Sequence, residues 1–377
     1  MDRRRNNKGD YAFGHWTSLS WSPVPLCSIG SFSWARYRVA VSPDSRSRVR
    51  PLSAPRLHRH DQERQDSDWL TRIWQQPNTR VLCISRGKAP IGETSNPTTN
   101  THPTTAPRLL LTAPQGDLPD TAVYLGEVGA EDLERHPKGT GPGHVVAVPR
   151  SSSPADNECV LPPRTAIWES LRSIGSLLPA VEAELLTHAT ALIAWHTSSA
   201  FCSACGGVTE ARSSGWARAC IRCETVHFPR TDPAVITAVI GADDCLLLGS
   251  AMRWDWRRYS TFAGFVEAGE SLENAIVREV KEEAGVVVDR VEYISSQAWP
   301  FPRSLMLGFL AHTGDVCATA DQEEIRDVRW FTRERLRHEI LSGAIALPPR
   351  SSISHALIAH WYGGVLPERD SDTALPS

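Results

Sequence analysis

Three glutamates, Glu279, Glu282 and Glu283, lie close together near the end of a segment, residues 271–284, that is expected to be helical. On a helix, side chains three and four positions apart share a face, so the three carboxylates would lie side by side. Like charges at this spacing repel by about a few tenths of a kcal/mol per pair. A bound cation relieves this repulsion, and carboxylate oxygens in this number suit Mg2+ or Mn2+. The sequence therefore predicts a divalent-cation site on this helix.

The glutamates belong to a longer pattern, G-x5-E-x7-R-E-U-x-E-E-x-G-U, in which U is an apolar residue. Besides the three glutamates, it is filled by Gly264, Glu270, Arg278, Val280, Gly285 and Val286. This pattern is identified as the Nudix box. Its many fixed positions disfavour the alternative interpretation, which is an acidic helix face that is merely exposed to solvent.

The other residues of the box have expected supporting roles. Gly264 would let the backbone approach the metal and phosphates closely, because it has no side chain. Arg278 would orient one of the glutamates through an ion pair, while Ile276 and Val280 anchor the helix on a sheet. Glu270 is near the start of the helix, where a carboxylate favours the helix dipole, so we expect it to be structural rather than catalytic.

Four of the nine cysteines form a second pattern, C-x2-C-x14-C-x2-C, made by Cys202, Cys205, Cys220 and Cys223. Each C-x2-C pair can place two thiolates on one tight turn, and two such turns complete a tetrahedral Zn2+ site. Four thiolates leave no open position on the metal, so this zinc is expected to be structural. Only three arginines lie in or beside the cysteine pattern, which disfavours the alternative that it binds nucleic acid directly.

A third stretch, "SSQAWPFPRS", follows the box by about ten residues. Together with the four cysteines, it resembles the NADH pyrophosphatase (NudC-type) family of Nudix hydrolases, whose array reads S-Q-P-W-P-F-P-x-S. One position departs from that array, because Ala298 stands where the family has proline. The resemblance implies a homodimer that cleaves NADH or NAD+ to nicotinamide mononucleotide and AMP, and it also implies an ability to remove NAD caps from RNA.

The resemblance also implies site residues. Glu279, Glu282 and Glu283 would bind the catalytic Mg2+ or Mn2+ together with the backbone of Ala263 and the later Glu324, with Glu283 acting as base or ligand. Arg278 is counted with the catalytic group. The expected substrate contacts are Phe228, Phe265, Gln297, Ala298, Trp299, Pro300, Phe301, Pro302, Arg303, Ser304 and Ser354. An aromatic face is a suitable partner for a flat base, although Trp299 and Phe301 could instead fill the core.

Strand and helix patterns alternate in mixed order through the second half of the chain, which favours an α/β or α+β sandwich over a doubly wound sheet. We therefore expect a Nudix α/β/α sandwich preceded by a zinc ribbon and a smaller N-terminal α+β domain. The expected divisions are an extension at 1–65, an N-terminal domain at 66–197, a ribbon at 198–230, a Nudix domain at 231–363 and a tail at 364–377.

The N-terminal domain is expected to contain a short helix at 68–76, a strand within 79–91 and further strands at 121–128 and 144–149. Two helices are predicted at 166–178 and 180–196, separated by Pro179. Thr, Pro, Gly and Ser dominate 92–108 and much of 136–158, which are expected to be mostly loop. No residue pattern in this domain indicates chemistry of its own.

Composition and charge limit the class of protein. The chain of 377 residues is 41% hydrophobic and 22% charged, which is typical of a soluble globular protein with two or three domains. Residues 1–65 carry 12 Lys and Arg against 5 Asp and Glu. This basic extension is expected to be disordered, with the alternative that it is not natively translated. No apolar run is long enough to cross a membrane, and a cytoplasmic protein is expected.

The sequence leaves three functions open. The first is metal-dependent hydrolysis of the NAD(H) pyrophosphate. The second is the same chemistry on NAD-capped RNA, or on other nucleoside diphosphate derivatives such as ADP-ribose. The third is a non-catalytic binding module, which the complete set of box glutamates disfavours. The residues do not rank NADH against NAD+.

Overall fold

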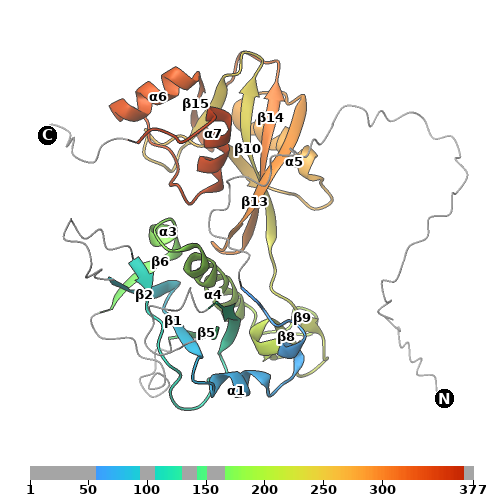
Figure 1. Cartoon of the computed structure of the whole chain (residues 1–377). Coiled ribbons are helices and arrows are strands. Elements are labelled where there is room, and N and C mark those ends of the chain that lie inside the picture. Colours follow the sequence, from blue (N-terminus) through green and yellow to red (C-terminus); the bar gives the residue numbers. More distant parts are fainter. Residues whose placement is uncertain (1–56, 94–106, 130–141, 151–165, 369–377) are drawn as a thin grey trace, which may run out of the picture. The chain divides into compact units, whose positions relative to one another are not determined.

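The computed structural model describes residues 57–93, 107–129, 142–150 and 166–368. Expectations for the first 56 residues, for most of the Thr/Pro-rich loop and for the last nine residues lie outside the described residues. The described part forms an N-terminal domain, a small cysteine ribbon and a C-terminal α/β domain (Figure 1).

One mixed sheet of six strands organises the C-terminal domain. Its strands are β10 (Asp232–Gly241), β11 (Leu246–Ala251), β12 (Phe262–Phe265), β13 (Arg290–Trp299), β14 (Ser304–Thr313) and β15 (Ile325–Phe331). The order is β13-β14-β10-β11-β15, with β12 also paired to β10. The β10–β14 pair is parallel and the other pairs are antiparallel, so the sheet is mixed.

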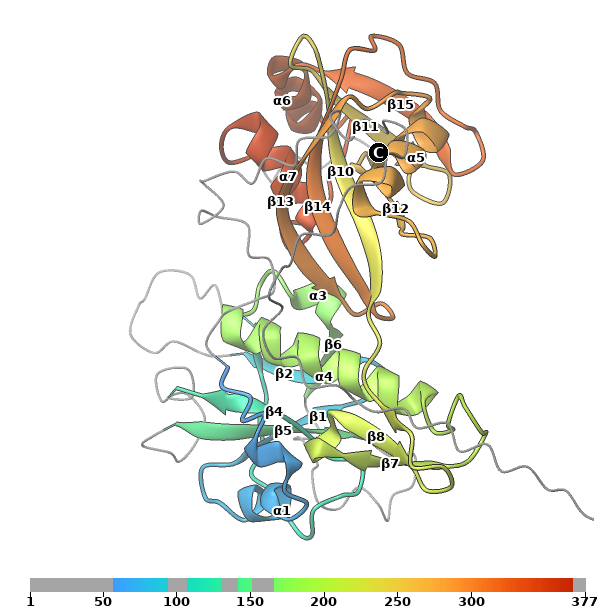
Figure 2. The ribbon, with the colours of Figure 1, turned by 90° about the vertical axis from the view of Figure 1, so that its right-hand side faces the viewer.

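Helices cover both faces of this sheet (Figure 2). Helix α5 (Leu272–Ala284) packs on one face, and the core between this helix and the sheet includes Val235 and Val239 of β10. Helices α6 (Arg333–Ser342) and α7 (Ile353–Tyr362) lie on the other face. The core between them and the sheet includes Ile236, Ala238 and Ile240, which alternate with the two valines along β10. Successive side chains of a strand point to opposite faces, so β10 supplies both cores. The predicted α/β/α sandwich is therefore confirmed.

The N-terminal domain contains two three-stranded sheets, β1-β5-β4 and β3-β2-β6. Its elements are η2 (Glu63–Gln65), α1 (Trp69–Trp74), β1 (Arg80–Ile84), β2 (Lys88–Glu93), β3 (Pro107–Leu109), β4 (Val123–Val128), β5 (Gly143–Pro149), β6 (Ile167–Ser170), α3 (Leu171–Ile174) and α4 (Ala180–Ser198). Apolar residues of α3, α4 and both sheets form one buried core. The ribbon follows, with β7 (Thr209–Arg212), η4 (Ser213–Gly215), β8 (Ala217–Cys220) and β9 (Val226–His227).

Three expectations need correction. The helix predicted at 166–178 begins as strand β6, because its first residues pair with β2, and only the four residues of α3 are helical after the Ser170 cap. Helix α6 was not predicted, since only Leu336 and Ile340 of its residues are buried. Residues 57–65, assigned to the extension, instead belong to the N-terminal domain, because His58 pairs with β4. Within the described ranges, no helix is both long and apolar enough to cross a membrane.

Candidate active site and cysteine ribbon

Helix α5 presents the box glutamates because local signals define both of its ends. The hydroxyl of Ser271 accepts a hydrogen bond from the Asn274 backbone N–H at 3.2 Å, which caps the first turn. At the other end, Gly285 adopts a left-handed conformation with φ of 68° and stops the helix. Ile276 and Val280 are buried against the sheet, as predicted, so the opposite side of the helix carries the charged residues.

Gly264 on β12 and Glu279 on α5 fit together without space for a larger residue. A Cβ placed on Gly264 would lie 1.8 Å from Cδ and 1.9 Å from Oε1 of Glu279. No side chain can occupy that volume, so glycine is required for the Glu279 carboxylate to sit against the strand. Gly264 was expected to let the backbone approach the metal and phosphates closely. In the structure, the atoms that come close to it are those of the Glu279 carboxylate.

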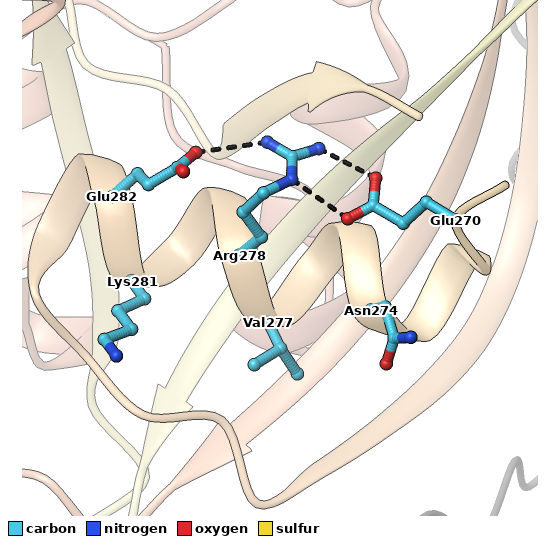
Figure 3. Close-up of a pocket in the computed structure, with 6 residues that line it drawn as sticks. All are labelled: Glu270, Asn274, Val277, Arg278, Lys281 and Glu282. Atoms are coloured by element: carbon cyan, nitrogen blue, oxygen red, sulfur yellow. Dashed lines mark hydrogen bonds and ion pairs between the residues drawn. The ribbon is translucent and has the colours of Figure 1, made fainter. Parts of the chain in front are cut away.

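Arg278 lies between Glu270 and Glu282 and is hydrogen-bonded to both (Figure 3). Its guanidinium donates two hydrogen bonds to Glu270, both at 2.9 Å, and one to the Phe265 carbonyl at 2.9 Å. It also donates to Glu279 at 2.8 Å and to Glu282 at 3.1 Å. These contacts lower the pKa of the Glu270 carboxyl. Arg278 thus holds two box glutamates and ties them to Glu270, which is the structural role expected for Glu270.

Glu283 is the most deeply buried of the box glutamates, with only 7% of its surface exposed. Burial, reinforced by the nearby charges of Glu279 and Glu324, raises the pKa of its carboxyl to about 8. The Ala263 backbone hydrogen-bonds to the Glu283 carboxylate. The Oε2 atom of Glu283 has no hydrogen-bond partner. A buried carboxyl oxygen without a partner, surrounded by other carboxylates, is an environment that favours a cation.

Glu324 approaches the helix from the loop before β15 and interacts electrostatically with both Glu279 and Glu283. Asp321, which sequence analysis missed, shapes this loop. Its carboxylate accepts hydrogen bonds from the backbone N–H groups of residues 323, 324 and 325, the last at 2.7 Å. Aspartate is a common turn residue because its carboxylate can accept hydrogen bonds from the backbone that follows, so Asp321 could have indicated this role.

The donor set fits a hard divalent cation. Glu279, Glu282, Glu283 and Glu324 provide carboxylate oxygens, and the pKa of Glu279 is also raised, chiefly by burial. Within the described ranges, these oxygens do not form a set of three that all lie within 4.8 Å of one another. Glu279 and Glu282 both accept hydrogen bonds from Arg278, whose positive charge offsets the repulsion between them.

The four ribbon cysteines converge as predicted. Their Sγ atoms all lie within 4.8 Å of one another, and three of the pairs are separated by 3.3 Å to 3.7 Å. Four sulfurs bound to zinc at about 2.3 Å would be about 3.8 Å apart, so these three separations are close to those of a tetrahedral zinc site. A Cβ on Gly207 would lie 3.1 Å from the Cys220 Sγ, which explains the glycine after the first pair.

We expect Cys205→Ser to lower the zinc content by about one equivalent per chain, because a closed four-thiolate site loses most of its affinity with one ligand. Metal analysis of the purified protein measures this content, and thermal unfolding would report the lost stabilisation. Cys317→Ser is the matched control, since Cys317 is an exposed cysteine outside the cluster. Unchanged zinc in the Cys205 variant would contradict a structural zinc site.

The predicted substrate wall is a hairpin between β13 and β14, and several of its polar residues point inward. Gln297 is only 3% exposed; its amide donates to the Ser351 carbonyl at 2.7 Å and accepts from the Ile353 backbone N–H at 2.8 Å. Arg303 donates to Asp232 at 2.8 Å. These side chains hold the hairpin to its neighbours, and their contact with substrate stays a prediction.

Ser304 and Ser354 are also buried. The Ser354 hydroxyl lies 2.8 Å from the hydroxyls of Ser260 and Thr261, in the segment leading to β12. It therefore joins α7 to the strand that carries Gly264.

The aromatic residues are the accessible part of the predicted substrate set. Phe265 is 57% exposed and Phe228 is 70% exposed, so each of the two rings is accessible to a ligand. Trp299 and Phe301 stack edge to face, with ring centroids 5.1 Å apart, and both are partly buried. Of the remaining positions, Pro300 is buried while Ala298 and Pro302 are exposed.

Two family models match the chain. The NUDIX domain matches residues 230–349, and the NADH pyrophosphatase zinc ribbon domain matches residues 198–228. The first range contains the glutamate site, and the second contains the four cysteines.

Two curated relatives match large parts of the chain. The human protein named NAD-capped RNA hydrolase NUDT12 is 40% identical over 192 residues, which are 48% of this chain and 42% of that protein. The NAD-capped RNA hydrolase NudC of Mycobacterium tuberculosis H37Rv is 36% identical over 257 residues, which are 64% of this chain and 76% of that protein. The chain thus spans less than half the length of the first. Among solved structures, a NUDIX hydrolase from Nitrosomonas europaea matches with a TM-score of 0.32 and 24% identity, over 45% of this chain and 96% of that one.

Proposed function

This chain belongs to the NADH pyrophosphatase (NudC-type) family of Nudix hydrolases, and on that premise we propose that it hydrolyses the pyrophosphate of NAD(H) to nicotinamide mononucleotide and AMP. The observation that carries this proposal is the glutamate cluster on α5. There, Glu283 is buried with one unpartnered oxygen in the field of Glu279 and Glu324. Beside it, the absence of a side chain at Gly264 leaves room for the Glu279 carboxylate.

We assign roles to the residues of this site as follows. Glu279, Glu282, Glu283 and Glu324 would hold Mg2+ or Mn2+ with the Ala263 backbone. A cation held there would neutralise the pyrophosphate charge and lower the pKa of a bound water. Glu283 would accept a proton from the attacking water or ligate the metal, since a cation bound beside it would favour the charged form of its carboxyl. Arg278 keeps Glu279 and Glu282 oriented.

The exposed aromatic rings would bind the flat ends of the dinucleotide. Phe265 and Phe228 offer open faces for a base, while Trp299 and Phe301 form one wall. Buried Gln297 would support this wall through its hydrogen bonds to residues 351 and 353. We also propose, from the family resemblance, that the protein is a homodimer and acts in the cytoplasm; light scattering during size-exclusion chromatography and cell fractionation test these two points.

The test of the proposed function is product analysis with the purified full chain. With Mn2+ or Mg2+ present, NADH should yield AMP and nicotinamide mononucleotide, separated by chromatography. ADP-ribose, diadenosine polyphosphates and coenzyme A serve as competing substrates on the same panel. Turnover of one of these with none of NADH would overturn the assigned substrate, and inactivity on the whole panel would favour a binding module.

A second candidate substrate, NAD-capped RNA, is favoured by the segment 252–258 between β11 and β12. Trp256 is 66% exposed, and the guanidinium of Arg257 lies 5.8 Å from its ring; a second arginine and tryptophan pair in the segment are 5.9 Å apart. The Met252 backbone N–H donates to the Glu324 carbonyl at 2.8 Å, so this segment adjoins the glutamate site. Aromatic rings stack on bases and arginines contact phosphates in single-stranded RNA.

We expect Trp256→Ala to lower kcat/KM for NAD-capped RNA by about tenfold, since one base stacking contact contributes about 1–3 kcal/mol. Turnover of free NADH should be unchanged, because NADH has no RNA chain to stack. Val287→Ala, which truncates another exposed apolar side chain, is the control. Equal effects of Trp256→Ala on both substrates, or none on either, would count against an RNA contact at this segment.

A further inference from the structure

We infer that His58, His60 and Glu127 form a site for a transition-metal ion such as Zn2+ in the N-terminal domain, separate from the ribbon cysteines. One ligating atom from each of the three side chains lies within 4.8 Å of the other two. Two imidazoles and one carboxylate are a donor set that suits Zn2+, Ni2+ or Cu2+ better than Mg2+. This inference does not depend on the proposed hydrolase activity.

The backbone holds two of the three ligands opposite each other. His58 and Glu127 form an antiparallel bridge: the His58 N–H donates to the Glu127 carbonyl at 3.1 Å, and the Glu127 N–H donates to the His58 carbonyl at 2.8 Å. Side chains of directly opposed residues project from the same face. A Cβ on Gly126 would lie 3.2 Å from the Leu57 Cβ, so this glycine permits the close approach of the 57–58 segment to β4.

His60 completes the set from a turn that is itself fixed. Its backbone is left-handed, with φ of 48°, and its carbonyl accepts the Arg64 N–H at 3.0 Å. The ring lies with its centroid 4.1 Å from that of His58, and its Nε2 is 2.7 Å from the Glu127 carboxylate. Its other nitrogen, Nδ1, is 3.7 Å from the Glu63 carboxylate. Metal-bound histidines commonly donate their second N–H to a carboxylate, and Glu63 is placed for this role.

The distances need only small changes to accept a metal. Zinc binds nitrogen and oxygen at about 2.0–2.1 Å, which places tetrahedral ligands about 3.3 Å apart. The His60–Glu127 pair at 2.7 Å would therefore open by about 0.6 Å while the wider separations close. His58 is exposed, and the side chains of His60 and Glu127 are 18% and 28% exposed, so rotation of the side chains can make this change. Three protein ligands leave a fourth position for water.

The alternative is that the same contacts serve only as an ion pair between His60 and Glu127. An ion pair needs just those two groups and gives no role to His58. A metal site requires all three, so the contribution of His58 to binding separates the two interpretations.

The experiment is a Co2+ titration of the full chain with the ribbon loaded with Zn2+ and the glutamate site saturated with Mg2+. We expect one added equivalent of Co2+ whose absorption shows weak ligand-field bands without the intense sulfur-to-metal band of a thiolate site. His58→Ala and His60→Ala should each remove this equivalent. Glu127→Gln, which preserves shape, should weaken it at least about tenfold. His338→Ala, another exposed histidine, should leave it unchanged.

The inference is overturned if the wild-type protein binds no such equivalent, or if His58→Ala retains it with undiminished affinity. Circular dichroism of each variant checks that the N-terminal domain is folded. Should either histidine variant fail to fold, Glu127→Gln still decides the question, because undiminished Co2+ binding by that folded variant would also overturn the site.

Discussion

Glu283→Gln is expected to lower kcat for NADH by about a thousandfold while the protein remains folded, since loss of a catalytic base or metal ligand costs about 10²- to 10⁴-fold. Glu283 has the environment for either role, because it is buried and shares the field of Glu279 and Glu324. Glutamine keeps the shape but neither accepts the proton nor supplies the charge. Steady-state assays with saturating Mn2+ measure the effect.

The raised pKa explains why folding should tolerate this change. With a pKa of about 8, the Glu283 carboxyl of the metal-free protein is mostly protonated at neutral pH and resembles the amide that replaces it. A carboxyl whose folded pKa is raised above its unfolded value destabilises the fold as pH rises from the unfolded value toward about 8. The stability of the metal-free wild type should therefore fall through this window, by at most about 1.4 kcal/mol per pH unit, and the Gln variant should lose this part of the slope.

Urea unfolding at several pH values in chelator measures that slope, and added Mg2+ should restore stability most at the alkaline end. Glu273→Gln on the same helix is the matched control, because Glu273 lies outside the predicted metal set. Near-full turnover by the Glu283 variant would show that Glu283 is neither the base nor an essential ligand.

Local patterns predicted most of this site. Helical spacing alone placed Glu279 and Glu283 on one face, and the cysteine spacing predicted a cluster whose sulfurs do converge. Such features depend on a few neighbouring residues, whose geometry is fixed by the helix or by a tight turn. The strands of the C-terminal domain could also be predicted from the sequence, because strands such as β10 are apolar on both faces.

Features that depend on distant partners were missed or misassigned. The contacts that the Gln297 amide makes with residues 351 and 353, more than fifty positions away, were not predicted. The sequence of strand β6 was predicted to be part of a helix, because its pairing with β2 leaves no local signal. His58 was assigned to an extension because its partner, Glu127, is distant in sequence and the bridge between them leaves no local pattern. Non-local pairing, rather than weak propensity, set the limit in each case.

Gly264→Ala is expected to lower kcat/KM for NADH by about a hundredfold, because a Cβ at this position would lie 1.8 Å from the Glu279 carboxyl carbon. The Glu279 side chain would have to leave its place, and a displacement of about 1 Å in a catalytic site costs about that factor. Overpacking of this kind should also cost about 1–3 kcal/mol of stability. Gly364→Ala is the control, since a Cβ there would meet nothing within 4 Å.

A double-mutant cycle separates the clash from any other effect of the methyl group. In Glu279→Ala the atoms that the new Cβ would strike are gone, so adding Gly264→Ala to that variant should cost little further stability. Activity should stay low in both, because the Glu279 carboxylate is absent. A coupling free energy near zero between the two positions, measured by urea unfolding, would show that the glycine and the glutamate do not share this space. A large coupling would instead mean that Gly264 belongs to the active site because it makes room for a carboxylate.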